Sequence, residues 1–188
     1  IAEELTRLLA APKPGAYLEA DILAVVIPEL DKQTLPELRD VIDRLEPGTE
    51  AMPTRLAALL LPLGEDGAKT ALKRLKCSNA LMNTVTTLVR ESSELLSRTR
   101  GGPFHCPPYC LRQQGPTLRT VLERTPDSPG KSGIELDTKR LLGRYGLKIV
   151  EQLNALCGAL CPERAADFAA QAALARQLDA DGVCCRVS

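Results

Sequence analysis

Apolar residues recur along the chain at helical spacing, in segments that clusters of Pro and Gly separate from one another. One clear stripe comprises Leu38, Val41, Ile42 and Leu45, and Pro47 follows it. Proline removes a backbone donor and disfavours helix at the residue before it, so a helix does not run through these clusters. The pattern predicts an array of short helices rather than one long bundle.

The composition favours the same class of fold. Aromatic residues make up 3% of the 188 residues, Trp is absent, and Leu and Ala are abundant. Strand propensity is therefore weak, and the core must be aliphatic. The length suffices for one or two hydrophobic cores. We expect an all-α fold without a substantial sheet.

Individual helices follow from these stripes and their end signals. Thr34 is predicted to form a capping box with Glu37, and Asp66 to cap a further helix. The segment 55–61 is apolar on nearly all sides, which predicts a central helix. Gly146 is expected either to separate two helices or to interrupt one. The expected helices are 1–11, 16–27, 34–46, 55–61, 66–76, 78–98, 134–160 and 162–179, with a short one near 117–124.

The chain divides into three parts. Residues 1–98 and 134–188 carry the helical patterns, whereas 99–133 is an irregular connection rich in Gly and Pro that holds the short helix. The chain does not open with Met, and Ile1 already belongs to a helical pattern. We therefore expect it to be a piece of a larger polypeptide.

Charge and cysteine content restrict the possible partners and the expected cellular location. Twenty-four basic and 24 acidic residues cancel, so any site for a polyanion must be local. An odd number of cysteines, seven, argues against a disulfide framework and favours a reducing, cytoplasmic location.

The longest apolar runs, 22–27 and 56–61, are too short to span a bilayer, so no membrane role is expected.

The sequence carries little of the chemistry of an active site. His105, Cys106 and Cys110 offer three soft ligands, one fewer than a structural zinc site normally takes, and a tight loop with incidental thiols is the simpler interpretation. Cys157 and Cys161 share a helix face and are expected in the core. We find no phosphate-binding loop, no nucleophile paired with His and no carboxylate cluster, and we predict no catalytic residue and no metal ligand.

Positive charge is arranged locally in two stripes. Each stripe lies opposite an apolar helix face, which by itself is more typical of a solvated surface than of a surface that contacts nucleic-acid phosphates. We predict RNA-backbone contacts from both sets, without reading of base sequence. The first set is Lys69, Lys73, Arg74 and Lys76, and the second is Lys139, Arg140, Arg144 and Lys148.

Several segments, in order, resemble the C-terminal helical part of bacterial tRNA nucleotidyltransferases, the family of CCA-adding enzymes and poly(A) polymerases. These segments are "IAEELTRLLAAPKP", "ADILAVVIPEL", "RLAALLL", "ALKRLKCSNALMNTVTTLV", "KRLLGRYGLKIVEQLNAL" and "LDADGVCCRVS". The resemblance implies that 1–98 holds the end of the neck and body helices, and that 134–188 holds body and tail helices. In the family these helices grip the backbone of the tRNA acceptor and T arms.

The resemblance also implies where the chemistry lies. The family's N-terminal head carries the Mg²⁺-binding carboxylates and uses CTP and ATP, and its motifs have no counterpart here. The expected partners are tRNA and the chain's own catalytic head, with no cofactor in this chain. Many members carry His-Asp where this chain has Leu61 and Pro62, so no phosphohydrolase-like site is expected. The alternatives are a helical domain for protein interaction or dimer formation and, less favoured, a hydrolase in its own right.

Overall fold

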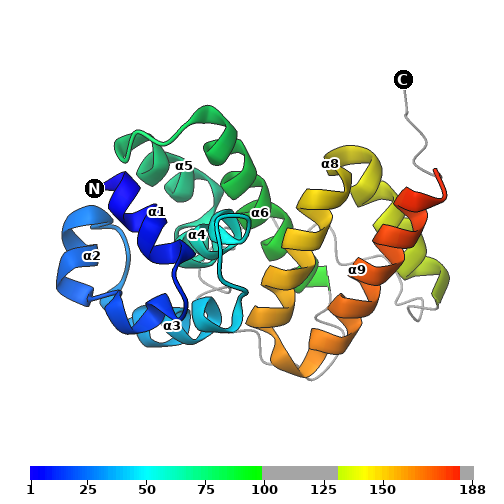
Figure 1. Cartoon of the computed structure of the whole chain (residues 1–188), viewed down its shortest axis with the longest axis horizontal. Coiled ribbons are helices and arrows are strands. Elements are labelled where there is room, and N and C mark those ends of the chain that lie inside the picture. The colour runs from blue at the N-terminus through cyan, green and yellow to red at the C-terminus, as the bar shows by residue number, and fades with distance from the viewer. Residues whose placement is uncertain (99–130, 183–188) are drawn as a thin grey trace, which may run out of the picture.

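The structure, a computed structural model, describes residues 1–98 and 131–182, and those residues fold as packed helices without a strand (Figure 1). The all-α prediction is confirmed. The α-helices are α1 Ala2–Ala10, α2 Ala20–Val26, α3 Leu35–Arg44, α4 Met52–Leu60, α5 Gly64–Arg74, α6 Asn79–Arg98, α8 Lys131–Leu160 and α9 Ala165–Ala180. Short 3-10 turns occupy Pro14–Tyr17, Lys32–Thr34, Leu61–Leu63 and Pro162–Arg164.

Helix α4 is the centre of the fold, as its apolar sequence predicts. Every residue from Thr54 to Leu60 is buried. Helices α1, α3, α5, α6 and α8 all pack on it, and α8 and α9 form a closely packed hairpin on the far side of α6 from α1 and α2 (Figure 1). Burial on all sides explains why α4 shows no polar stripe.

The one charged residue of α4, Arg55, is buried and binds the ends of two other helices. Its Nη1 donates to the carbonyls of Leu9 and Ala11 at 2.7 and 2.6 Å, and its Nη2 donates to that of Leu45 at 2.6 Å. These carbonyls lie at the C-terminal ends of α1 and α3, where helices leave acceptors unpaired and carry partial negative charge. Burial lowers the pKa of Arg55, but the guanidinium stays charged. The sequence gives no sign of this role.

A second arginine explains why the segment 16–27 is not one helix, contrary to the prediction. Arg39 donates through Nε and Nη2 to the carbonyl of Leu18, at 3.1 and 2.6 Å. Because the Leu18 carbonyl accepts from Arg39, it is not available for a hydrogen bond within a helix, and Leu18 and Glu19 are not helical. A 3-10 turn therefore precedes α2.

Two predicted caps are wrong for local reasons. The Thr34 side chain makes no cap bond, because a 3-10 turn runs into α3 and Asp31 caps that turn by accepting from the Gln33 amide at 3.0 Å. Asp66 lies inside the first turn of α5, because the helix begins at Gly64, whose φ of 69° is accessible to glycine. Asp66 there complements the helix dipole instead of capping it.

The remaining boundaries agree closely with the sequence. Ser78 precedes α6, and its hydroxyl accepts from the Leu81 amide at 3.3 Å. Helix α8 begins at Lys131, within the connection expected over 99–133, and the short helix near 117–124 lies outside the described residues. Cys157 and Cys161 are buried, as predicted.

Candidate nucleic-acid interface

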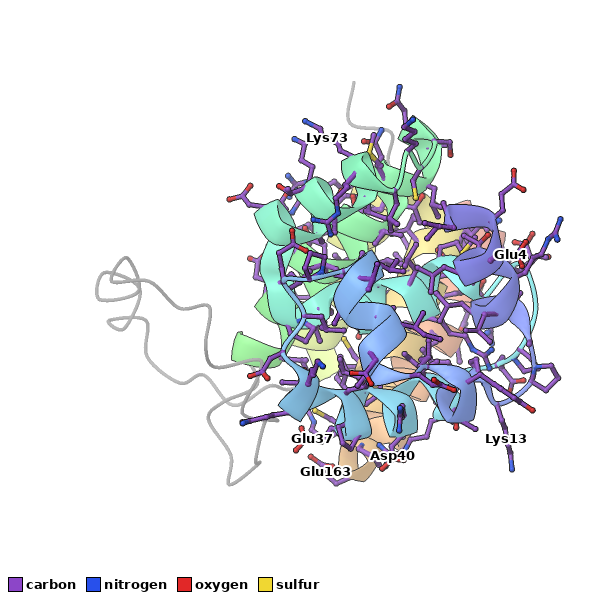
Figure 2. The ribbon with its side chains drawn as sticks, turned by 90° about the vertical axis from the view of Figure 1, so that its left-hand side faces the viewer. Glu4, Lys13, Glu37, Asp40, Lys73 and Glu163 are labelled. Atoms are coloured by element: carbon purple, nitrogen blue, oxygen red, sulfur yellow. The ribbon has the colours of Figure 1, made fainter. Side chains whose placement is uncertain are left out.

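Three lysines of the first basic set project from the C-terminal end of α5. Lys69, Lys73 and Lys76 are exposed, while Ala68 and Leu72 on the opposite face are buried. Among the described residues, no ion pair reaches these three lysines. Figure 2 shows Lys73 pointing into solvent at one end of the molecule. Their charges are therefore available to an outside anion.

The end of α5 sets the direction of Lys76. The Cys77 amide donates to the Leu72 carbonyl, and the Lys76 amide to the Lys73 carbonyl, which is the hydrogen-bond pattern of a Schellman motif. Lys76 takes the left-handed position of this motif, with φ of 54°, where glycine is usual. Lys76 thus lies beyond the helix, and the expected helical row contains only Lys69 and Lys73.

Arg74, the fourth member of this set, already has partners within the chain. Its two Nη atoms donate to both carboxylate oxygens of Glu29, at 2.5 and 2.7 Å, and Nη2 also donates to the Val26 carbonyl at 3.2 Å. The hydrogen bond from Arg74 lowers the pKa of Glu29 and raises that of Arg74. Arg74 fastens α5 to the C-terminal end of α2, unlike the three lysines.

The second basic set does not form the single row predicted from its spacing. Gly146 interrupts α8 with φ of 77° and ψ of 168°, so Lys148 belongs to a different helical segment from Arg140 and Arg144. Lys148 pairs with Glu50 at 2.5 Å, and Arg140 pairs with Asp137 at 3.5 Å.

The other two members of the second set lie on the surface of α8. Lys139 and Arg144 are exposed, and the Arg144 guanidinium lies 5.3 Å from the ring centroid of Tyr145. A stacked guanidinium keeps its outer N–H donors available to a phosphate. Arg144 is therefore the member of this set best prepared for such a contact.

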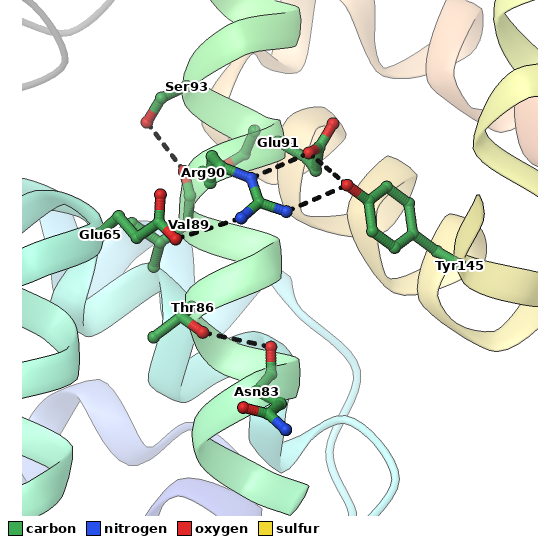
Figure 3. A network of polar contacts seen from close by, with 9 residues as sticks. Glu65, Asn83, Thr86, Val89, Arg90, Glu91, Ser93 and Tyr145 are labelled. Atoms are coloured by element: carbon green, nitrogen blue, oxygen red, sulfur yellow. Dashed lines mark hydrogen bonds and ion pairs between the residues drawn. The ribbon is translucent and has the colours of Figure 1, made fainter.

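A polar network joins α5 and α8, the helices that carry the two basic sets, through α6 (Figure 3). Arg90 Nη1 donates to Glu65 of α5 at 3.1 Å, and Nη2 donates to the Tyr145 hydroxyl of α8 at 3.0 Å. The Tyr145 hydroxyl donates to the buried carboxylate of Glu91 at 2.6 Å, and Arg90 Nε donates to the same oxygen at 3.1 Å. The network fixes α5 and α8 on either side of α6.

The network also shifts the pKa values of two of its groups. Burial is the main reason that the pKa of Tyr145 is raised, and its hydrogen bond to Glu91 adds to the effect. The hydrogen bond to Tyr145 is the main reason that the pKa of Arg90 is raised. The sequence offers no signal for this site, because adjacent opposite charges such as Arg90 and Glu91 are typical of a solvated helix.

Within residues 1–98 and 131–182, no group of three or more His, Cys, Asp or Glu side chains could hold a metal ion. His105, Cys106 and Cys110 lie outside the described residues. Leu61 and Pro62 lie in the 3-10 turn after α4. The described helices include none long and apolar enough to cross a membrane.

Comparison with protein-family models, with curated proteins and with solved structures yields no significant match to the chain.

Proposed function

We propose that this chain is the tRNA-holding helical portion of a tRNA nucleotidyltransferase that adds CCA to tRNA 3′ ends. Nucleotide transfer, with Mg²⁺, CTP and ATP, belongs to a catalytic head outside these residues. The proposal rests on the ordered sequence resemblance and on one structural observation in particular. Lys69, Lys73 and Lys76 are exposed together, without an ion pair to any described residue.

The distribution of charge supports an approach of RNA from this end. In Figure 2, Lys73 lies at one end of the molecule, and three acidic residues lie at the other end together with the basic Lys13: Glu37, Asp40 and Glu163. A neutral protein can bind a polyanion in this way, because the local field and not the net charge acts over a Debye length. The lysines also offset the partial negative charge of the α5 C-terminus, which would otherwise repel a phosphate.

The second set supports a smaller role. Arg144 extends the basic surface across α6, whereas Arg74, Arg140 and Lys148 would have to give up intramolecular partners to bind phosphate. We therefore assign the main backbone contacts to the α5 lysines and a supporting contact to Arg144.

The test is tRNA binding by the triple variant Lys69→Glu, Lys73→Glu and Lys76→Glu. Each lost phosphate contact should lower the slope of log K against log salt concentration by about 0.7–0.9. Three contacts should lower it by about 2–3, and the Kd near 0.1 M salt should rise about 100-fold or more.

The matched control carries the same change in charge outside α5, with Arg7→Glu, Lys13→Glu and Lys32→Glu. These residues are exposed, and the ion pairs of Arg7 and Lys32 are surface pairs of little energetic value. The control should retain most of the affinity and the salt slope. Equal losses in the two variants would mean that net charge alone governs binding, and unchanged binding in the α5 variant would remove the assignment.

A domain for protein interaction is the second candidate function. The observation that favours it is the exposure of large apolar side chains on and beside α1 and α2: Ile1, Tyr17, Ile22 and Val25.

A further inference from the structure

We propose that the groove between α1 and α2 binds a short amphipathic helix of another protein, with an apolar stripe flanked by Lys and Arg. The groove has a volume of about 640 Å³. Leu5, Leu18 and Leu23 are buried in it, whereas Ile22 and Val25 are 56% and 80% exposed along it. None of the α5 lysines lines this groove, so the inference does not depend on RNA binding.

The spacing of the apolar residues fits a helix as the occupant. Ile1, Leu5 and Leu8 on one side follow steps of four and three, and on the other side Ile22 and Val25 are three residues apart on α2. Two such ridges leave a trough into which the ridge of a third helix packs. Helix α1 has nine residues and is about 14 Å long, so an occupant of about three turns would cover it.

The charged residues around the groove indicate which kind of helix would bind in it. The charged residues that line the groove are Glu4, Glu19 and Asp21, and none of the described basic residues lines it. Glu4 is paired with Arg7 and Asp21 with Lys32, but both pairs are exposed on both sides and easily exchanged for a partner's cation. An apolar trough with an acidic border therefore complements an apolar stripe with basic flanks.

The same charges argue against other occupants. A second copy of this groove would bring acidic borders together, and RNA would meet carboxylates instead of cations. A small apolar ligand requires walls that enclose most of its surface, whereas Ile22 and Val25 are themselves largely exposed.

The test uses the whole chain and a fluorescein-labelled peptide of about 14 residues, with Leu at helical spacing and Lys elsewhere. Fluorescence anisotropy measures the Kd. A scrambled peptide of the same composition and a peptide with Glu in place of Lys should bind at least about tenfold more weakly. In ¹⁵N-labelled protein, the peptide should shift amide resonances of residues 1–26 and leave those of α9 unchanged.

Ile22→Ala with Val25→Ala should weaken peptide binding about tenfold, because exposed anchors of the groove are lost while helix propensity is kept. The matched control is Ala169→Ser with Ala173→Ser, at exposed positions of α9, and it should bind as the wild type does. Equal affinity of the two variants, equal binding of the scrambled peptide, or the absence of amide shifts in residues 1–26 would overturn the proposal. So would a dimer in sedimentation equilibrium that Ile22→Ala with Val25→Ala dissociates, because the groove would then hold a second copy.

Discussion

Replacement of the buried Arg55 by Met tests how the helices are held around α4. The guanidinium is 1% exposed and supplies the donors for three carbonyls at the ends of α1 and α3. Met keeps much of the length and the apolar stem but has no donor. The variant therefore leaves the carbonyls of Leu9 and Leu45 buried without that partner, and that of Ala11 partly so.

The expected loss in the free energy of unfolding follows from these hydrogen bonds. An unpaired buried acceptor costs about 1–3 kcal/mol, so the two fully buried carbonyls together cost about 2–6 kcal/mol. Removal of a desolvated charge offsets part of this loss, and so does removal of the Nε atom, which has no hydrogen-bond partner among the described residues. We expect a net loss of about 2–4 kcal/mol, a large share of the stability of an ordinary domain.

The assay is urea unfolding followed by far-ultraviolet circular dichroism, with the midpoint expected to fall at constant slope. Arg44→Met is the matched control, because Arg44 also donates to a carbonyl near a helix end, that of Ala159 at 3.1 Å, but is exposed. It should cost about 1 kcal/mol or less. Arg55→Lys, which keeps the charge without the planar fork, should lie between the two.

One result would refute this reasoning. If Arg55→Met were as stable as the wild type, or lost no more than Arg44→Met, the desolvation cost of the guanidinium would equal everything that its hydrogen bonds contribute.

Three further outcomes are expected. Lys76→Gly should raise the unfolding free energy by about 0.5–1 kcal/mol in the same urea assay, because glycine adopts the left-handed position without strain, while tRNA affinity falls. Gly15→Ala should cost about 1–3 kcal/mol and lower the melting temperature, because a Cβ atom there would lie 2.7 Å from Oδ2 of Asp43, whose other oxygen accepts from the Gly15 amide. The pKa of Glu29 is lowered by Arg74, so their pair should stabilise the fold above about pH 4.3, and that stabilisation should disappear as the pH falls through the lowered pKa. The stability difference between wild type and Glu29→Gln, measured against pH, should therefore shrink in acid, and a constant difference would contradict this account.

Much of the fold could be predicted from the sequence, because helix formation here depends on neighbours three and four residues away. The stripe of Leu38, Val41 and Ile42 is buried as expected, and α4 is the central helix. One failure is local in origin, and the other comes from a tertiary contact between residues 21 positions apart. Thr34 competes with Asp31 for the cap, and the carbonyl of Leu18 is diverted to Arg39.

The candidate site was less predictable, because spacing identifies a charged side chain but not its partner. Lys148 and Lys73 occupy similar positions in the sequence pattern, yet Lys148 reaches Glu50 whereas Lys73 extends into solvent. In the sequence, Arg90 resembles an ordinary surface residue, but in the structure it connects three helices.

The sequence by itself determined the helical class, most helix positions and the apolar faces, since each of these depends on residues within one or two turns. Only the tertiary structure decided which cations remain available and which hold the fold together. The physical reason is that the acceptors lie on remote segments: the carbonyls bound by Arg55 belong to α1 and to the end of α3, and the carboxylate bound by Arg74 follows α2. The role of each long basic side chain is therefore fixed by packing and not by its place in a repeat.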